Sequence, residues 1–304
     1  MIGSPGAGGL PVRTAGKTRA AGLSIASNSL LIALKLAAGA ITGSIAILTE
    51  AVHSGIDLLA SVVAFASVRK ADEPADADHP YGHEKVENLA AAIEGMLILV
   101  GAGIIVFESV RRLVDPAEIS SLGVGIAVIG FSAVANFAVS TYLYRQARAT
   151  ESPALEGDAA HLRTDSATSA GVLVALVLVE LTGLDWIDSA AALTVAAAIV
   201  FAGVKILSRS SRVLVDEALP DSELDAVREA FEQHGASELA GFHKLRARRA
   251  GSRRHIDLHV QFAEGTSLIR AHELAHELQR DIGGRLRGAD VLIHLEPSDL
   301  APRE

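Results

Sequence analysis

Cysteine is absent from the sequence. Disulfide bridges and thiolate metal sites are therefore excluded, and any metal site has to use imidazole nitrogens or oxygen ligands. Positive charge is also scarce, with 27 Lys and Arg against 36 Asp and Glu and a formal net charge of −9. Because nucleic-acid binding depends on clustered Lys and Arg, this balance predicts no nucleic-acid partner.

A nucleotide-binding motif is also missing. Residues 11–18 read PVRTAGKT, which ends like a P-loop, but Pro11 stands where the first glycine belongs and no strand precedes it. We therefore predict no nucleotide partner. Residues 1–19 are rich in Gly and Pro and lack the apolar core of a signal peptide, which predicts a disordered leader.

Long runs with little charge fill the sequence up to Arg212. Hydrophobic residues make up 50% of the chain, and its mean hydropathy is +0.34. Six runs approach the ~20 residues that span a bilayer as a helix, and they cover residues 20–41, 45–69, 87–110, 121–145, 158–181 and 186–207. The pattern predicts an all-α membrane domain of six transmembrane helices over residues 20–212, followed by a cytoplasmic α+β domain over residues 213–304.

Basic residues gather on one side of these predicted spans. By the positive-inside rule this side is cytoplasmic, and an even number of spans puts both termini there. Arg111 and Arg112 lie on the opposite side. The residues on the predicted cytoplasmic side are Lys17, Arg19, Arg69, Lys70, Lys85, Arg145, Arg148, Arg209 and Arg212.

Two of the predicted membrane helices each carry a histidine and an aspartate four residues apart. His53 and Asp57 lie in the second run, and His161 and Asp165 lie in the fifth, so each pair shares one helix face. An ionisable side chain at mid-bilayer costs about 2.5–3.5 kcal/mol and normally faces a polar cavity or another such group. The pattern predicts a cation site of two nitrogens and two oxygens, with inter-helix hydrogen bonds as the alternative. Glu50, one turn before His53, is open to a role as a further ligand or as a proton carrier.

The ligand types indicate which ion is bound. Two imidazoles and two carboxylates fit tetrahedral Zn²⁺, whereas oxygen-only sites suit Mg²⁺ or Mn²⁺ and Cu⁺ prefers sulfur. Fe²⁺, Co²⁺ and Cd²⁺ are the alternatives. A protonated imidazole nitrogen cannot bind metal, so a site that faces the two sides of a membrane in turn would exchange Zn²⁺ for protons. We predict a Zn²⁺/H⁺ antiporter, which is a secondary transporter and not an enzyme.

At these residues the sequence resembles the cation diffusion facilitator family of zinc transporters. Residues 44–60 are similar to its signature of a serine, small and aliphatic residues, a His or Asp, and an Asp four residues on, although Glu50 departs from it. The stretches HPYGHEKVENLAAAIEG and HLRTDSATS are similar to further family hallmarks. The resemblance covers residues 20–298 and implies a transport site formed by His53, Asp57, His161 and Asp165.

The resemblance implies further features outside the membrane helices. Asp76, His79 and His83 match a second metal site in a loop, although by chemistry alone such residues are as often solvated as bound. Lys85 and Asp216 match a charge interlock that joins the membrane and soluble parts of a homodimer.

The tail has the pattern of an αββαβ domain, with a helix at 222–234, strands at 241–249 and 255–262, a helix at 267–283 and a strand at 290–296. Strand alternation directs Ile256, Leu258, Val260 and Phe262 toward the core and leaves His294 and Glu296 on the polar face. In the family this is the metallochaperone-like dimerisation domain. The resemblance implies a regulatory zinc site formed by His243, His259, His272, His294 and Glu296.

Residues 272–276 read HELAH, the pattern with which zinc metalloproteases bind zinc and activate a water. A protease needs a third ligand and a cleft for a peptide, which a module of this size does not readily offer. We therefore interpret His272 as the family ligand and His276 as a surface histidine. The predicted apolar stripe of this helix consists of Leu268, Ala271, Ala275, Leu278 and Ile282.

The sequence as a whole predicts a homodimeric exporter of divalent cations in a lipid bilayer. The connection RQARATESPALEGD between the fourth and fifth spans lacks a His-rich insertion, and in this it resembles bacterial members. We therefore expect a bacterial cell membrane as its location. A membrane zinc metallopeptidase and a non-transporting metal sensor are the alternatives of another class.

Overall fold

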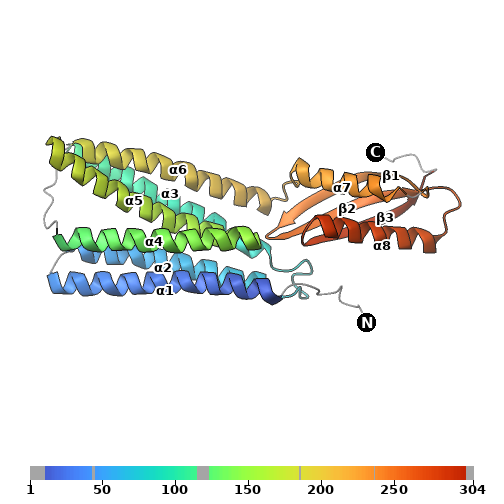
Figure 1. Cartoon of the computed structure of the whole chain (residues 1–304), viewed down its shortest axis with the longest axis horizontal. Coiled ribbons are helices and arrows are strands. Elements are labelled where there is room, and N and C mark those ends of the chain that lie inside the picture. Colours follow the sequence, from blue (N-terminus) through green and yellow to red (C-terminus); the bar gives the residue numbers. More distant parts are fainter. Residues whose placement is uncertain (1–10, 43–44, 115–122, 185, 236, 299–304) are drawn as a thin grey trace. The chain divides into compact units, whose positions relative to one another are not determined.

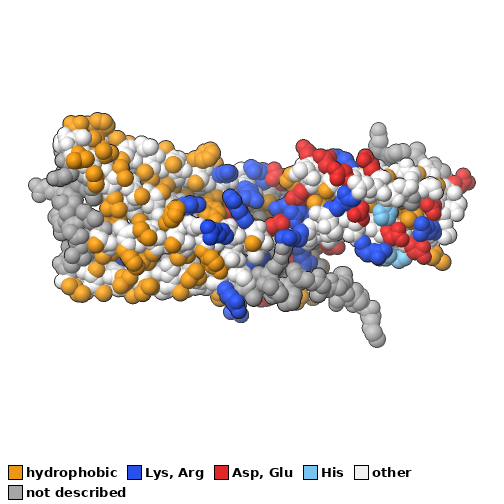
Figure 2. All heavy atoms as spheres, viewed as in Figure 1, with side chains coloured by type: hydrophobic (Ala, Val, Ile, Leu, Met, Phe, Trp, Pro, Cys, Tyr) orange, Lys and Arg blue, Asp and Glu red, His pale blue; other side chains and the backbone are white. Residues whose placement is uncertain are grey.

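The computed structural model describes residues 11–42, 45–114, 123–184, 186–235 and 237–298. The chain divides into two compact units, Met1–Ser211 and Arg212–Glu304. Hydrophobic side chains are spread over the surface of the first unit, whereas Lys, Arg, Asp and Glu side chains are dense on the second (Figure 2). The two units therefore suit different surroundings.

Six helices form the part of the first unit that the structure describes, and they run side by side (Figure 1). Each of them corresponds to one predicted hydrophobic run, and the prediction of a helical transmembrane domain is confirmed. The helices are α1 (Pro11–Thr42), α2 (Ile45–Ala71), α3 (Lys85–Val114), α4 (Gly123–Thr150), α5 (Pro153–Thr182) and α6 (Trp186–Leu214).

Large apolar side chains point outward from these helices. Val100, Val134 and Phe201 are 61%, 70% and 73% exposed, a surface that is stable against lipid and not against water. Within the described residues, five segments are long and apolar enough to cross a membrane: Gly16–Ile41, Lys85–Arg111, Ala127–Thr150, Pro153–Val179 and Ser189–Leu214. These segments belong to five of the six helices, and the other helix, α2, has 27 residues.

α1 begins earlier than its hydrophobic run. The helix covers residues 11–19, which the sequence predicted as part of a disordered leader, while residues 1–10 lie outside the described chain. The physical reason for the difference is a buried charge pair. Lys17 donates a hydrogen bond of 2.7 Å to Glu87 of α3, and the two side chains are only 8% and 2% exposed. Since a buried ion pair is stable only with both partners in place, it holds the polar first turns of α1 against α3.

α5 begins with a helix cap. Ser152 Oγ accepts a hydrogen bond from the Leu155 backbone N–H, and Pro153 occupies the first helical turn, where its missing N–H is no loss. Ser152 Oγ also donates a hydrogen bond to Glu87. The starts of α1, α3 and α5 are therefore joined at one buried carboxylate.

The second unit has the predicted αββαβ order of elements. They are α7 (Asp221–His234), β1 (Leu239–Ala250), β2 (Arg253–Phe262), α8 (Leu268–Arg285) and β3 (Ala289–Pro297). β2 is the central strand, antiparallel to β1 and parallel to β3. The parallel pairing requires a crossover connection, which α8 provides.

One core holds this sheet and its two helices together. It combines Val227 and Ala230 of α7 with Leu274 and Leu278 of α8, and the sheet contributes Ile256, Leu258, Val260 and Phe262, as the strand alternation predicts. The prediction for Leu268 was wrong, because this side chain is 76% exposed. Leu268 is the first residue of α8, directly after the capping residue Ser267, and Leu274 takes a place in the core instead.

We expect Leu258→Ala to destabilise the second unit by about 2–5 kcal/mol, because it removes buried methyl groups and leaves a cavity in the core. Leu268→Ala makes the same chemical change at an exposed position and should alter stability by less than about 0.5 kcal/mol. Urea denaturation of residues 212–304 expressed alone measures both. Equal losses in the two variants would contradict the assigned core.

Candidate metal sites

Three groups of histidine and carboxylate side chains converge in the described parts of the structure. In each group, one ligand atom from every residue lies within 4.8 Å of all the others. One group lies among the helices of the first unit, one in the loop between α2 and α3, and one on the sheet of the second unit. All three consist of residues that the sequence identified.

The group among the helices consists of Asp57 from α2 and of His161 and Asp165 from α5. His161 Nε2 lies 3.2 Å from Asp57 Oδ1 and 3.9 Å from Asp165 Oδ2. The side chains of His161 and Asp57 are 8% and 7% exposed. The helical spacing of four residues brings His161 and Asp165 onto one face, and packing of α2 against α5 adds Asp57.

The structure does not describe the side chains of two further residues that the sequence suggests for this group. The side chains of His53 and Glu50 lie outside the described residues, so the fourth ligand stays a prediction. The three remaining residues offer one nitrogen and two carboxylates, which is a donor set that suits Zn²⁺ and neighbouring divalent transition metals.

The structure adds buried polar groups beside this site that sequence reasoning missed. Lys35 of α1 donates a hydrogen bond of 2.7 Å to Ser54 of α2. Asp158 of α5 and Glu94 of α3 are completely buried. Lys35 and Glu94 interrupt hydrophobic runs and Asp158 begins one, and that signal in the sequence could have identified them.

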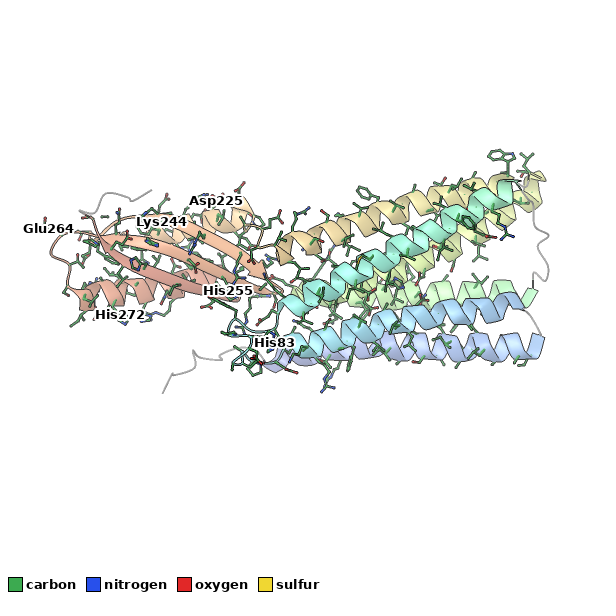
Figure 3. All side chains as sticks on the ribbon, turned by 180° about the vertical axis from the view of Figure 1, so that it is seen from behind. His83, Asp225, Lys244, His255, Glu264 and His272 are labelled. Atoms are coloured by element: carbon green, nitrogen blue, oxygen red, sulfur yellow. The ribbon has the colours of Figure 1, made fainter. Side chains whose placement is uncertain are left out.

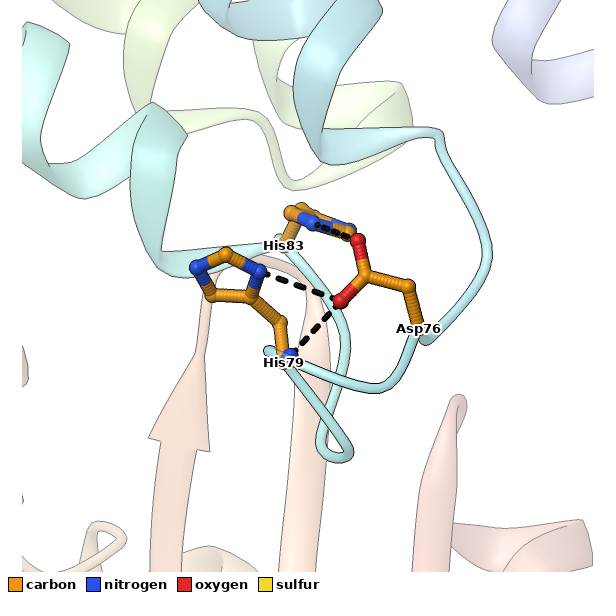
Figure 4. A group of neighbouring side chains, drawn as sticks. All are labelled: Asp76, His79 and His83. Carbon is orange, nitrogen blue, oxygen red and sulfur yellow. Dashed lines mark hydrogen bonds and ion pairs between the residues drawn. The ribbon is translucent and has the colours of Figure 1, made fainter.

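The loop group consists of Asp76, His79 and His83 (Figure 4). Asp76 Oδ1 accepts a hydrogen bond of 2.6 Å from the His79 backbone N–H and lies 3.2 Å from His79 Nδ1. Asp76 Oδ2 lies 3.1 Å from His83 Nε2. The His79 backbone N–H is the main group that lowers the pKa of Asp76, which keeps this carboxylate ionised and able to bind a cation.

A tight turn brings the two histidines of the loop together. The Gly82 N–H donates to the His79 carbonyl oxygen at 3.0 Å, and the imidazole centroids of His79 and His83 are 4.6 Å apart. Gly82 has φ +90, a conformation that L-residues with a side chain rarely adopt. The turn therefore depends on glycine at this position.

The sheet group consists of His243, His259 and Glu296. His243 pairs with His259 across β1 and β2, and His259 pairs with His294 across β2 and β3, so three histidines form a row over the sheet. Glu296 lies 2.6 Å from His243 Nε2 and 2.6 Å from His259 Nδ1. These hydrogen bonds, from His259 first and then His243, lower the pKa of Glu296 to about 2.

An irregularity in β1 positions His243. The β1–β2 register shifts between His243 and Arg246, and Lys244 has φ 50. This bulge adds one residue to β1. As a result Phe242 and Leu245 both pack against the core, while His243 faces Glu296.

Two of the predicted sheet ligands differ in their surroundings from the rest. His294 Nε2 lies 3.7 Å from Glu296 Oε1, beside the group. His272, which is labelled in Figure 3, is on α8, and its Nε2 lies 3.1 Å from Nε2 of His276. Within the described part of the second unit His272 does not join the His243 group, and its role as a ligand stays a prediction.

The HELAH stretch does not have the surroundings of a protease site. His272 and His276 are exposed, and Glu273 accepts a hydrogen bond of 3.3 Å from Arg270. Among the described residues the pair belongs to no group of three or more potential ligands. The geometry therefore gives no support to a metallopeptidase.

The two residues of the predicted interlock belong to different units. Lys85 begins α3 in the first unit. Asp216 lies in the second unit and accepts a hydrogen bond of 3.0 Å from Arg248. A pairing of Lys85 with Asp216 stays a prediction.

Comparison with known proteins gives matches over most of the chain. Residues 22–215 match the cation efflux transmembrane domain, and residues 219–298 match the cation efflux protein cytoplasmic domain. A Synechocystis sp. protein described as the uncharacterized transporter sll1263 is 36% identical over 275 residues, which are 90% of this chain and 88% of that relative.

Two further matches are to a cation-efflux pump and to a solved structure. The cation-efflux pump FieF of Salmonella paratyphi A is 31% identical over 94% of this chain and 95% of its own. A solved structure of CzrB in its zinc form is 31% identical and covers 29% of this chain and 99% of the CzrB chain, with a TM-score of 0.27. With matches to both characteristic domains, the chain belongs to the cation diffusion facilitator family of cation efflux transporters.

Proposed function

We propose that this protein exports Zn²⁺ in exchange for protons. The observation that carries the proposal is the buried group of Asp57, His161 and Asp165, whose ligand atoms converge within 4.8 Å among the helices of the first unit. Ionisable side chains in such surroundings are costly unless they serve a partner or a permeating ion. Convergence of three such groups from two helices supports a binding site for the transported cation.

Zinc is the metal that the donor set favours. Nitrogen donors shift preference away from Mg²⁺ and Mn²⁺, and the absence of cysteine removes the ligand that Cu⁺ prefers. His53 would complete a tetrahedron of two nitrogens and two oxygens, which is a common zinc geometry. Fe²⁺, Co²⁺ and Cd²⁺ are the competing substrates, because they accept the same ligand types.

Protons are the counter-ion because they compete with the metal for the same atoms. A ring nitrogen that holds a proton cannot bind zinc, so zinc release and protonation favour each other. Alternating access of the site to the two sides of the membrane then couples zinc export to proton entry. This mode requires no nucleotide.

The remaining features fit a homodimer in a bacterial cell membrane with both termini in the cytoplasm. The basic residues between the spans support this orientation. The loop group of Asp76, His79 and His83 and the sheet group around Glu296 are additional metal sites. The cytoplasmic domain senses zinc through the sheet group, and the Lys85–Asp216 interlock joins the two domains.

We expect Asp57→Asn and Asp165→Asn each to reduce zinc uptake into inside-out membrane vesicles by at least about tenfold, because each removes a charged ligand of the transported ion. Asp225→Asn is the matched control, since this side chain is 56% exposed on α7. Uptake of radioactive zinc measures the effect, and size-exclusion profiles check folding. Normal uptake by both site variants would contradict the transport site.

An acidic vesicle lumen should accelerate zinc uptake into inside-out vesicles, because protons leave as zinc enters. Dissipating the pH difference with an ionophore should remove this acceleration. The same assay with Fe²⁺, Co²⁺ and Cd²⁺ identifies the preferred metal. Zinc binding without uptake would indicate a metal sensor, and faster uptake of another metal would displace the zinc proposal.

Glu296→Gln should weaken zinc binding to residues 212–304 by about 10- to 100-fold, because Glu296 bridges two of the histidines. His276→Ala should leave the affinity of the sheet site unchanged. Affinity for zinc should also fall as the pH is lowered, since imidazole binds metal only when deprotonated. Calorimetric titration measures all three effects, and equal affinities for Glu296→Gln and the unaltered domain would refute the site.

A further inference from the structure

A carboxylic acid without a hydrogen-bond partner lies inside the helical unit. Glu94 of α3 is 0% exposed. Among the described residues neither Oε1 nor Oε2 has a hydrogen-bond partner. An ionised carboxylate in this position would lose its hydration without compensation, so the neutral, protonated form is the stable one unless positive charge lies nearby.

The neighbours of Glu94 belong to the proposed transport site. Glu94 packs against α5, since a side chain at Gly157 would begin 3.1 Å from Glu94 Cβ. Gly157 lies directly before Asp158 and one helical turn before His161. Glu94 is therefore close enough to the cation site to respond to its charge state.

Asp158 is the second buried acid in these surroundings. Its side chain is 0% exposed, and its Oδ1 accepts a hydrogen bond of 2.9 Å from Ser61 of α2. Ser61 in turn accepts one from Asn28 of α1 at 2.9 Å. Asp158 Oδ2 has no hydrogen-bond partner within the described chain. Together Glu94 and Asp158 place three carboxylate oxygens without a hydrogen-bond partner in the described chain near the cation site.

Among the described residues of α6, which also packs against α3, neither Lys205 nor Arg209 is directed toward Glu94. α6 packs against α3 at Gly95, where a side chain would begin 2.9 Å from the Leu207 backbone nitrogen. Lys205 on this part of α6 is exposed, and Arg209 donates hydrogen bonds of 2.8 Å to Glu156.

Glu94 is not arranged as a ligand of the same ion. The group of ligand atoms within 4.8 Å of one another contains Asp57, His161 and Asp165 but not Glu94. A buried acid that lies outside the ligand set, but within its electric field, responds to the ion by gaining or losing a proton.

We propose that Glu94 is a proton-binding residue of the transport cycle, which is protonated while the neighbouring site holds no cation and deprotonated while it holds one. The proposal rests on the proposed exchange of a divalent cation for protons and adds a residue to it. On cation entry the O–H bond of Glu94 breaks, the electron pair stays on the carboxylate, and the proton passes to water on the side to which the site is open. The reverse occurs when the cation leaves.

The test counts protons released when zinc binds to the purified full-length protein in detergent. Titration calorimetry in two buffers of different ionisation enthalpy gives this number at one pH. We expect Glu94→Gln to release fewer protons per bound zinc, by up to about one. Glu108→Gln is the matched control on the same helix, where the side chain is 43% exposed, and it should release as many protons as the unaltered protein.

Equal proton release by Glu94→Gln and the unaltered protein would overturn this inference and leave the proposed antiport intact. Zinc binding by the unaltered protein without any proton release would instead contradict the antiport itself. An infrared measurement covers the case in which Glu94→Gln does not fold. The unaltered protein should lose the C=O band of a protonated carboxyl group when zinc is added, and an unchanged band would equally overturn the inference.

Discussion

Ionisable side chains in the helical unit are buried among helices whose outer surface is apolar, and burial of charge is costly without a partner. The structure meets this cost in different ways. Lys17 and Glu87 form an ion pair that holds the ends of helices together. Asp57, His161 and Asp165 converge on one point, where we propose that a cation or protons neutralise them. Glu94 has no hydrogen-bond partner in the described chain, which favours a bound proton.

These solutions differ in what they allow the protein to do. A permanent ion pair such as Lys17–Glu87 stabilises one arrangement of helices and is unsuited to exchange. A converging set of ligands gains stability from whichever cation or protons occupy it, so its occupancy is free to change with the side of the membrane that it faces. The coupling that we propose depends on placing the converging ligands and the proton-binding residue Glu94 within a few helical turns of each other.

The second unit brings its ligands together by strand register. His243, His259 and His294 come from three strands and line up because the pairing of β2 with both neighbours puts them opposite one another. Glu296 already accepts hydrogen bonds from two of these histidines. A metal would replace those protons at the same atoms, so the group is suited to respond to metal concentration with little rearrangement of the sheet.

The sequence by itself determined the helical spans, the αββαβ tail and the His–Asp pairs of the helical group, because hydrophobic periodicity and the spacing of His and Asp within one element are local properties. The residues of the loop and sheet groups were predicted from the resemblance to the family. The loop group depended on local spacing as well, with Gly82 providing the turn. The tertiary structure alone decided which groups meet across elements. Packing of α2 on α5 brought Asp57 to His161, and packing of α3 on α5 buried Glu94 against Gly157. The bulge at Lys244 directed His243 toward Glu296, and Lys17 kept the start of α1 helical through a partner seventy positions away in α3. Such contacts depend on packing between distant segments, which no local pattern encodes.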